Sequence, residues 1–74
     1  MENILIYGSA WNNNGHSATA SCDTGTLISS SDFSKDGAKL VTYLYYVPAV
    51  TNGQMINMEL YGEQAMIKIC KLKE

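Results

Sequence analysis

The sequence predicts a small all-β domain in which about six short strands form an antiparallel meander, closed as a sandwich or a barrel. Turn signals centred on glycine divide the chain into short segments. The segments between them are rich in β-branched and aromatic residues, and several alternate apolar with polar side chains. A chain of 74 residues has room for one domain, which we place over residues 1–74.

Five turn signals set the bounds of the expected strands. They are Asn14-Gly15, Asp23-Thr24-Gly25, Asp36-Gly37, Asn52-Gly53 and Gly62-Glu63. Asparagine, aspartate and glycine adopt the positive φ of tight turns at the lowest cost, and glycine first in a pair predicts a type II′ turn at Gly62. The predicted strands are residues 3–10, 16–22, 26–33, 38–47, 54–61 and 64–72.

Residues 34–46 also fit a helix, because Ser34 could cap it and Leu40 and Leu44 would share a face. Gly37 in the first turn and the β-branched and aromatic residues that follow oppose a helix. We expect a strand here and keep an α+β fold with this helix as the alternative.

The segment of residues 17–22 alternates small residues, with Ala18, Ala20 and Cys22 on the predicted inner face. Side chains this small leave little space between a strand and its neighbours. We therefore expect another layer of the domain to pack closely on them.

Three predicted strands are apolar on both faces. Residues 38–47 place Leu40, Leu44 and Tyr46 on one face and Val41, Tyr43, Tyr45 and Val47 on the other. Residues 3–10 and 64–72 repeat this, with Ile4 and Ile6 against Leu5 and Tyr7, and Ile67 and Ile69 against Met66, Cys70 and Leu72. One small domain encloses one interior, so the excess implies a partner surface. The candidate interface residues are Tyr43, Tyr45, Tyr46, Ile67 and Ile69.

The charge pattern argues against nucleic-acid binding. The formal net charge is -2 and the chain has no arginine, whereas nucleic-acid-binding proteins normally present a basic stripe with arginines. We interpret Lys68, Lys71 and Lys73 as solubilising charges on an edge strand. The longest apolar passage, residues 40–50, is far shorter than the roughly 20 residues of a membrane-spanning helix, so we expect no membrane partner.

The two cysteines, Cys22 and Cys70, and the single histidine, His16, are too few for a self-contained zinc site, so we expect no metal and no cofactor. The first residues do not resemble a secretory signal, which makes the cytoplasm the expected compartment and a virion the other setting considered. Without a sign of secretion, we expect two small buried thiols rather than a disulfide.

The triplet Asp23-Thr24-Gly25 resembles the active-site loop of aspartic proteases, in which paired loops bring two carboxylates together to activate water. The resemblance implies a symmetric dimer of the retroviral type, with Asp23 as the catalytic carboxylate of each chain. Ser21 and Cys22 stand where that family usually has two bulky apolar residues. Aspartate also begins turns and glycine supplies a positive φ, so we expect a turn and assign no catalytic residue.

Residues 10–16 contain the only tryptophan, three consecutive asparagines and the only histidine. An indole plate beside amide donors and acceptors is what a sugar-binding loop needs. The candidate ligand-binding residues are therefore Trp11, Asn12, Asn13, Asn14 and His16. The alternative, which we favour, is that the indole covers the core and the asparagines serve a tight turn.

These observations favour a non-enzymatic structural or protein-interaction subunit, which associates with itself and with another protein through apolar strand faces. Its composition, poor in charge and rich in Ser, Thr, Asn and Gly, resembles that of small accessory proteins of virus or phage particles. A carbohydrate-binding module that uses residues 11–14 is the second hypothesis, with a glycan as partner. A dimeric aspartic protease that uses Asp23 is the third.

Overall fold

The computed structural model describes residues 1–13 and 18–72, which form six β-strands. The all-β prediction is confirmed, and the α+β alternative is wrong because residues 34–46 lie in two strands and the turn between them. The described residues include no helix long and apolar enough to cross a membrane. The strands are β1 Glu2–Asn12, β2 Thr19–Cys22, β3 Thr26–Lys35, β4 Ala38–Val50, β5 Met58–Tyr61 and β6 Gln64–Leu72.

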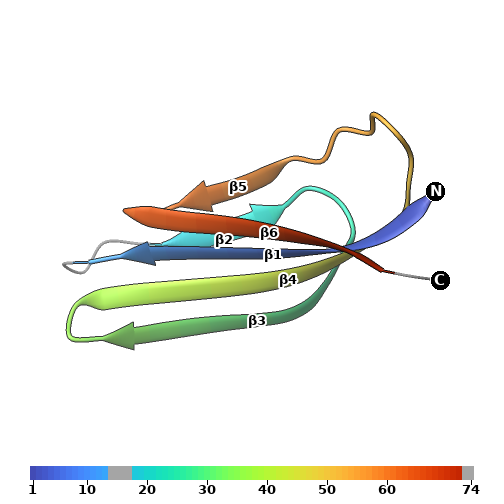
Figure 1. The fold of residues 1–74 in the computed structure, drawn as a ribbon. Coiled ribbons are helices and arrows are strands. Elements are labelled where there is room, and N and C mark those ends of the chain that lie inside the picture. Colours follow the sequence, from blue (N-terminus) through green and yellow to red (C-terminus); the bar gives the residue numbers. More distant parts are fainter. Residues whose placement is uncertain (14–17, 73–74) are drawn as a thin grey trace.

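The strands form two antiparallel sheets (Figure 1). The larger has the order β3-β4-β1-β6, and the smaller pairs β2 with β5. This order differs from that of a meander, since among the described strands β3 and β4 are the only paired ones that follow one another in the chain. Because β1 pairs with β4 on one side and with β6 on the other, the N-terminal strand lies inside the larger sheet. The edges of the larger sheet are β3 and β6, so Lys68 and Lys71 lie on an edge strand as predicted, whereas Lys73 lies outside the described residues.

The hairpin between β3 and β4 forms because its turn residues accept positive φ. Asp36 has φ 51° and Gly37 has φ 82°, and Lys35 pairs with Ala38 across the turn. Two positive φ values in a two-residue loop are those of a type I′ turn, whose twist matches that of paired strands. The turn predicted from Asp36-Gly37 is confirmed.

The turn signals at residues 23–25, 52–53 and 62–63 connect the two sheets rather than close hairpins, and Asn14-Gly15 lies outside the described residues. At Asn52-Gly53, the Gln54 N–H donates to the Thr51 carbonyl at 3.1 Å, and Gly53 has φ 82°. The type II′ turn expected at Gly62 is wrong, because its φ is not positive and it joins strands of different sheets. A Cβ at Gly62 would lie 2.8 Å from the Trp11 carbonyl oxygen, so glycine here permits close approach to β1.

The smaller sheet packs on β1 and β4 through small side chains. Ala18 and Ala20 are buried, as predicted, and pack with Ala10 and Val41 of the larger sheet. A second cluster joins Ile4, Ile6 and Val47, against which Cys22, Ile56 and Met58 pack. The strand predicted over residues 54–61 is shorter than expected, since residues 51–57 cross from one sheet to the other.

Candidate functional site

One face of the larger sheet is covered by β2 and β5, and the other is not. Along β1 the buried residues Ile4, Ile6 and Ala10 alternate with half-buried ones such as Leu5 and Tyr7. The strand register continues this alternation across the sheet. We call the uncovered side the open face. Its residues are Leu5, Tyr7, Ser9 and Trp11 of β1; Thr26, Ser29, Ser31, Phe33 and Lys35 of β3; Ala38, Leu40, Thr42, Leu44 and Tyr46 of β4; and Gln64, Met66, Lys68, Cys70 and Leu72 of β6.

No residue of the open face is buried. Large apolar and aromatic side chains occupy most of it, and a row of hydroxyls crosses it at Ser31, Thr42 and Ser9. The Ser31 and Thr42 hydroxyls are 2.6 Å apart and share a hydrogen bond. The two charged residues, Lys35 and Lys68, lie on the edge strands. The open face is therefore apolar along β1 and β4 and polar at its margins.

The five predicted interface residues do not share one surface. Tyr46 lies on the open face and is half-buried. Tyr43 and Tyr45 lie on the covered face, where each packs against a core cluster and their ring centroids are 6.3 Å apart. Ile67 and Ile69 also point to the covered side, but they are 45% and 60% exposed because the short smaller sheet does not cover β6.

The residues predicted to bind a sugar are also divided. Trp11 lies half-buried on the open face, where it lines a hollow of about 190 Å³ with Phe33, Lys35, Ala38 and Leu40. Asn12 alternates with Trp11 in β1, so its side chain lies toward the other face. The Asn13 N–H donates to Asn12 Oδ1 at 2.9 Å. Asn14 and His16 lie outside the described residues.

The aspartate of the Asp23-Thr24-Gly25 triplet is bonded to the smaller sheet. Its carboxylate accepts the Asn57 N–H at 3.1 Å and the Asn57 side-chain amide at 2.8 Å. Its own N–H donates to the Asn57 carbonyl at 3.0 Å. A hollow of about 450 Å³ beside it is lined by Ser21, Cys22, Asp23, Asn57 and Glu59. The geometry is that of a turn that closes the smaller sheet.

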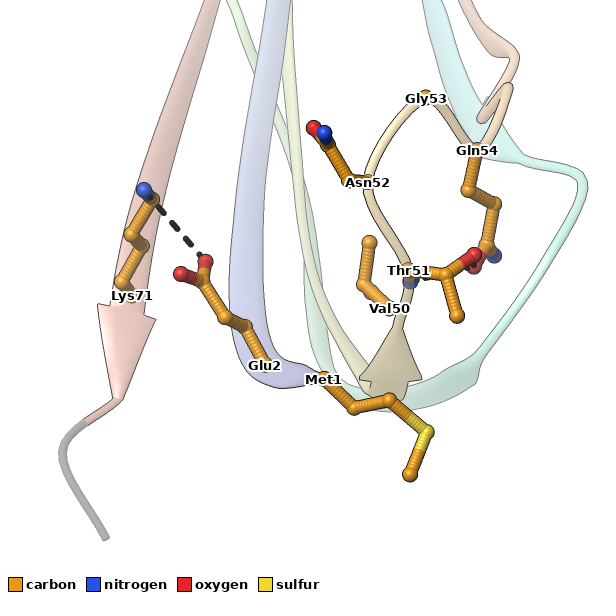
Figure 2. Close-up of a pocket in the computed structure, with 8 residues that line it drawn as sticks. All are labelled: Met1, Glu2, Val50, Thr51, Asn52, Gly53, Gln54 and Lys71. Atoms are coloured by element: carbon orange, nitrogen blue, oxygen red, sulfur yellow. Dashed lines mark hydrogen bonds and ion pairs between the residues drawn. The ribbon is translucent and has the colours of Figure 1, made fainter.

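A further hollow of about 430 Å³ lies beside the turn after β4, between Glu2 and Lys71 on one side and residues 50–54 on the other. In Figure 2 the Glu2 carboxylate points to Lys71, 3.4 Å away, and both side chains are largely exposed. Thr51 and Gln54 bond to each other, with the Thr51 N–H 3.1 Å from Gln54 Oε1. Most polar groups here pair along the rim, so they do not converge on a ligand.

The two cysteines are free and lie on different sides of the larger sheet. Cys22 is half-buried beside the core, whereas Cys70 is exposed on the open face. The expectation of two buried thiols is therefore wrong for Cys70. It lies on an edge strand, where few neighbours surround a side chain.

The sequence pattern predicts part of the open face. The alternation in residues 38–47 predicts that Leu40, Leu44 and Tyr46 share a face of the strand, and this grouping is confirmed. What the pattern does not reveal is which of two apolar faces the smaller sheet covers. The small residues of β1, Gly8 and Ala10, are the signal for the covered side. Comparisons of the chain with protein-family models, with curated proteins and with solved structures found no match.

Proposed function

We propose that this protein is a non-enzymatic structural or protein-interaction subunit that associates with itself through the open face. The observation that carries the proposal is an apolar sheet face that no part of the described chain covers. Soluble proteins rarely leave contiguous apolar patches larger than a few hundred Å² in water. Association of two open faces would remove both patches from water and complete a sandwich of sheets.

The size of the open face suits a dimer. The Cα atoms extend over 43 × 19 × 15 Å, so a face that runs along the longest dimension has an area on the order of the 800 Å² that each partner buries in a standard interface. Interfaces of this size span dissociation constants from micromolar to picomolar. We therefore expect association at tens of micromolar protein.

The composition of the open face also suits an interface. Tyrosine, tryptophan, phenylalanine and methionine are enriched in the cores of protein interfaces, while charged residues remain at the rim. Tyr7 and Trp11 of β1 and Tyr46 of β4 follow this rule, and the lysines lie on the edge strands. Two sheets packed face to face lie about 10 Å apart, which side chains of this length fill from both sides.

A pair of lysine substitutions tests the proposal. Leu44 is half-buried on the open face, and Ile69 is 60% exposed on the opposite side of the same sheet. In a free monomer of Leu44→Lys, the aliphatic stem of the introduced lysine keeps the lateral contacts and its ammonium group reaches water. In a face-to-face dimer that charge is buried without a partner, at a cost of several kcal/mol. We expect light scattering to show a lower mass for Leu44→Lys, which loses the face-to-face contact, and the native mass for Ile69→Lys.

The rate at which a thiol reagent labels Cys70 is a second test of association through the open face. Cys70 lies on the open face, so it should react slowly with a thiol reagent in the associated protein and fast in Leu44→Lys. Equal rates in both proteins would contradict the proposal. Loss of association in Ile69→Lys alone would place the interface on the other side of the sheet.

A further inference from the structure

The edge of the larger sheet formed by β3 offers a second interaction surface, independent of the open face. All ten residues of β3 are exposed, and the strand pairs with β4 on one side alone (Figure 1, lower edge of the sheet). An edge strand presents unpaired N–H and C=O groups that can pair with another strand. Which residues carry these groups follows from the hairpin.

The type I′ turn fixes the direction of every backbone group in β3. In a two-residue hairpin, the residues that flank the turn exchange both hydrogen bonds, so Lys35 and Ala38 form a hydrogen-bonded pair. Such pairs alternate along the ladder, which directs the backbone groups of Ser29, Ser31 and Phe33 toward β4. The N–H and C=O groups of Ser30, Asp32 and Ser34 therefore point away from the sheet. No backbone hydrogen bond within the described part of the chain uses them.

The two edges of the sheet differ in how they are protected. Lysine on an edge strand discourages pairing with other chains, and β6 carries Lys68 and Lys71 with their side chains on opposite faces. β3 carries two charged residues, Asp32 and Lys35, and Lys35 lies at the end of the strand beside the turn. Lys39 of β4 lies 3.3 Å from the Asp32 carboxylate and neutralises it. Apart from Lys35 at its end, the edge at β3 therefore carries little net charge to repel a strand.

From these observations we propose that β3 is a strand-addition site whose occupant is β3 of a second copy, paired antiparallel about a two-fold axis at Ser31. In this register Ser30 lies opposite Asp32 of the other copy, so outward backbone groups meet and each hydroxyl can donate to a carboxylate. A register centred on Asp32 would place two carboxylates opposite each other, and like charges directly opposite are destabilising. A register centred on Phe33 shortens the overlap, because the turn ends the strand at Lys35.

Joined edges and joined open faces would use different two-fold axes. The edge axis is perpendicular to the sheet, whereas a face-to-face axis lies parallel to it. Two such contacts close at four copies when the axes intersect. The edge contact is independent of the proposed function, but the count of four copies rests on it.

Proline at an outward N–H tests the edge. Proline is tolerated on an edge strand when the N–H it removes faces solvent, so Ser30→Pro should keep the pairing of β3 with β4. Ser30→Ala is the matched control, because it removes the same hydroxyl and keeps the N–H. By sedimentation equilibrium we expect four copies of the 8.1 kDa chain for the native protein and Ser30→Ala, and two for Ser30→Pro.

The same variants in the Leu44→Lys background separate the two contacts. There we expect two copies when residue 30 is the native serine or carries Ser30→Ala, and one copy with Ser30→Pro, since the open face no longer contributes. Equal masses for Ser30→Pro and Ser30→Ala in both backgrounds would overturn the edge proposal. Four copies that survive Leu44→Lys would instead contradict the open-face proposal.

If Ser30→Pro does not fold, hydrogen exchange of the native protein tests the edge contact. At high protein concentration the amides of Ser30, Asp32 and Ser34 should become protected, while those of Ser31 and Phe33 are protected at every concentration. Fast exchange at Ser30, Asp32 and Ser34 at every concentration would also overturn the proposal.

Discussion

A single side chain, Asp23, fixes one of the places where the chain passes between the sheets. Asp23 bonds to the backbone and the side chain of Asn57, directly beyond the paired residues Cys22 and Met58. The carboxylate thus replaces a backbone acceptor where the ladder of β2 and β5 ends. The hydrogen-bond partners of Asp23 all belong to Asn57 of the same chain, as a turn requires. A catalytic dyad would not require these bonds.

Removal of the Asp23 carboxylate should weaken the fold in a graded way. We expect Asp23→Ala to lower the free energy of unfolding by about 1–2 kcal/mol, because two hydrogen bonds to Asn57 are lost. Asp23→Asn should cost less than about 1 kcal/mol, since asparagine keeps one acceptor for the Asn57 N–H. Urea denaturation measures both. A pepstatin-sensitive peptidase activity that disappears in Asp23→Asn would instead support the protease hypothesis.

Gly25 combines a positive φ with close approach to β4. Its φ is 86°, and a Cβ there would lie 2.5 Å from the Tyr46 carbonyl oxygen and 2.7 Å from Val47 Cγ2. The control is Gly53, which has φ 82° and nothing within 4 Å of its Cβ position.

We expect Gly25→Ala to destabilise the protein by about 3 kcal/mol and Gly53→Ala by about 1 kcal/mol. Both alanines carry the cost of the left-handed region, but only the one at residue 25 also displaces β4. The midpoint of urea denaturation separates the two variants. Equal losses would show that close approach at residue 25 contributes nothing.

The distance between the two sheets depends on the small residues of the elements that face each other. Ala20 of β2 is 3% exposed and lies above β1, where a Cβ on Gly8 would be 3.9 Å from the Ala20 methyl group. Because β2 and β5 have four residues each, they supply few contacts. The smaller sheet is therefore held on the larger sheet mainly by close packing.

Enlarging the inner face of β2 should therefore separate the layers. We expect Ala20→Leu to cost about 1–3 kcal/mol through overpacking. Ser21→Leu, whose side chain faces away from the larger sheet and is exposed, should change the unfolding free energy by less than about 0.5 kcal/mol. Thermal unfolding of the two variants makes the comparison. A stable Ala20→Leu protein would mean that the sheets can move apart freely.

The strands and turns show which structural features can be predicted from local sequence patterns. The alternation in residues 38–47 and 64–72 gives the correct faces of β4 and β6, and Asp36-Gly37 gives the correct turn. The strand order was not predictable from turns, because the pairing of β1 with β6 joins the two ends of the chain. The same lack of information on strand order explains why the interface prediction grouped Tyr43 and Tyr45 with Tyr46. Only the position of the smaller sheet shows that Tyr43 and Tyr45 are covered.

In the molecule as a whole, the smaller sheet is too short to cover the larger sheet on which it packs. The larger sheet has strands of nine to thirteen residues, whereas β2 and β5 have four residues each. One face is therefore partly covered and the other is open, and the chain leaves Phe33, Met66 and Ile69 at least half exposed. Self-association follows if burial of this apolar surface exceeds the entropy cost of joining two chains.

Sedimentation equilibrium of the native protein shows whether the open face associates. Across a dilution series from tens of micromolar, we expect a mass of at least two copies of the 8.1 kDa chain that falls toward one copy on dilution. Leu44→Lys, measured beside it, should lose the face-to-face contact at every concentration. A native protein that sediments as a single 8.1 kDa chain at tens of micromolar would contradict self-association through the open face.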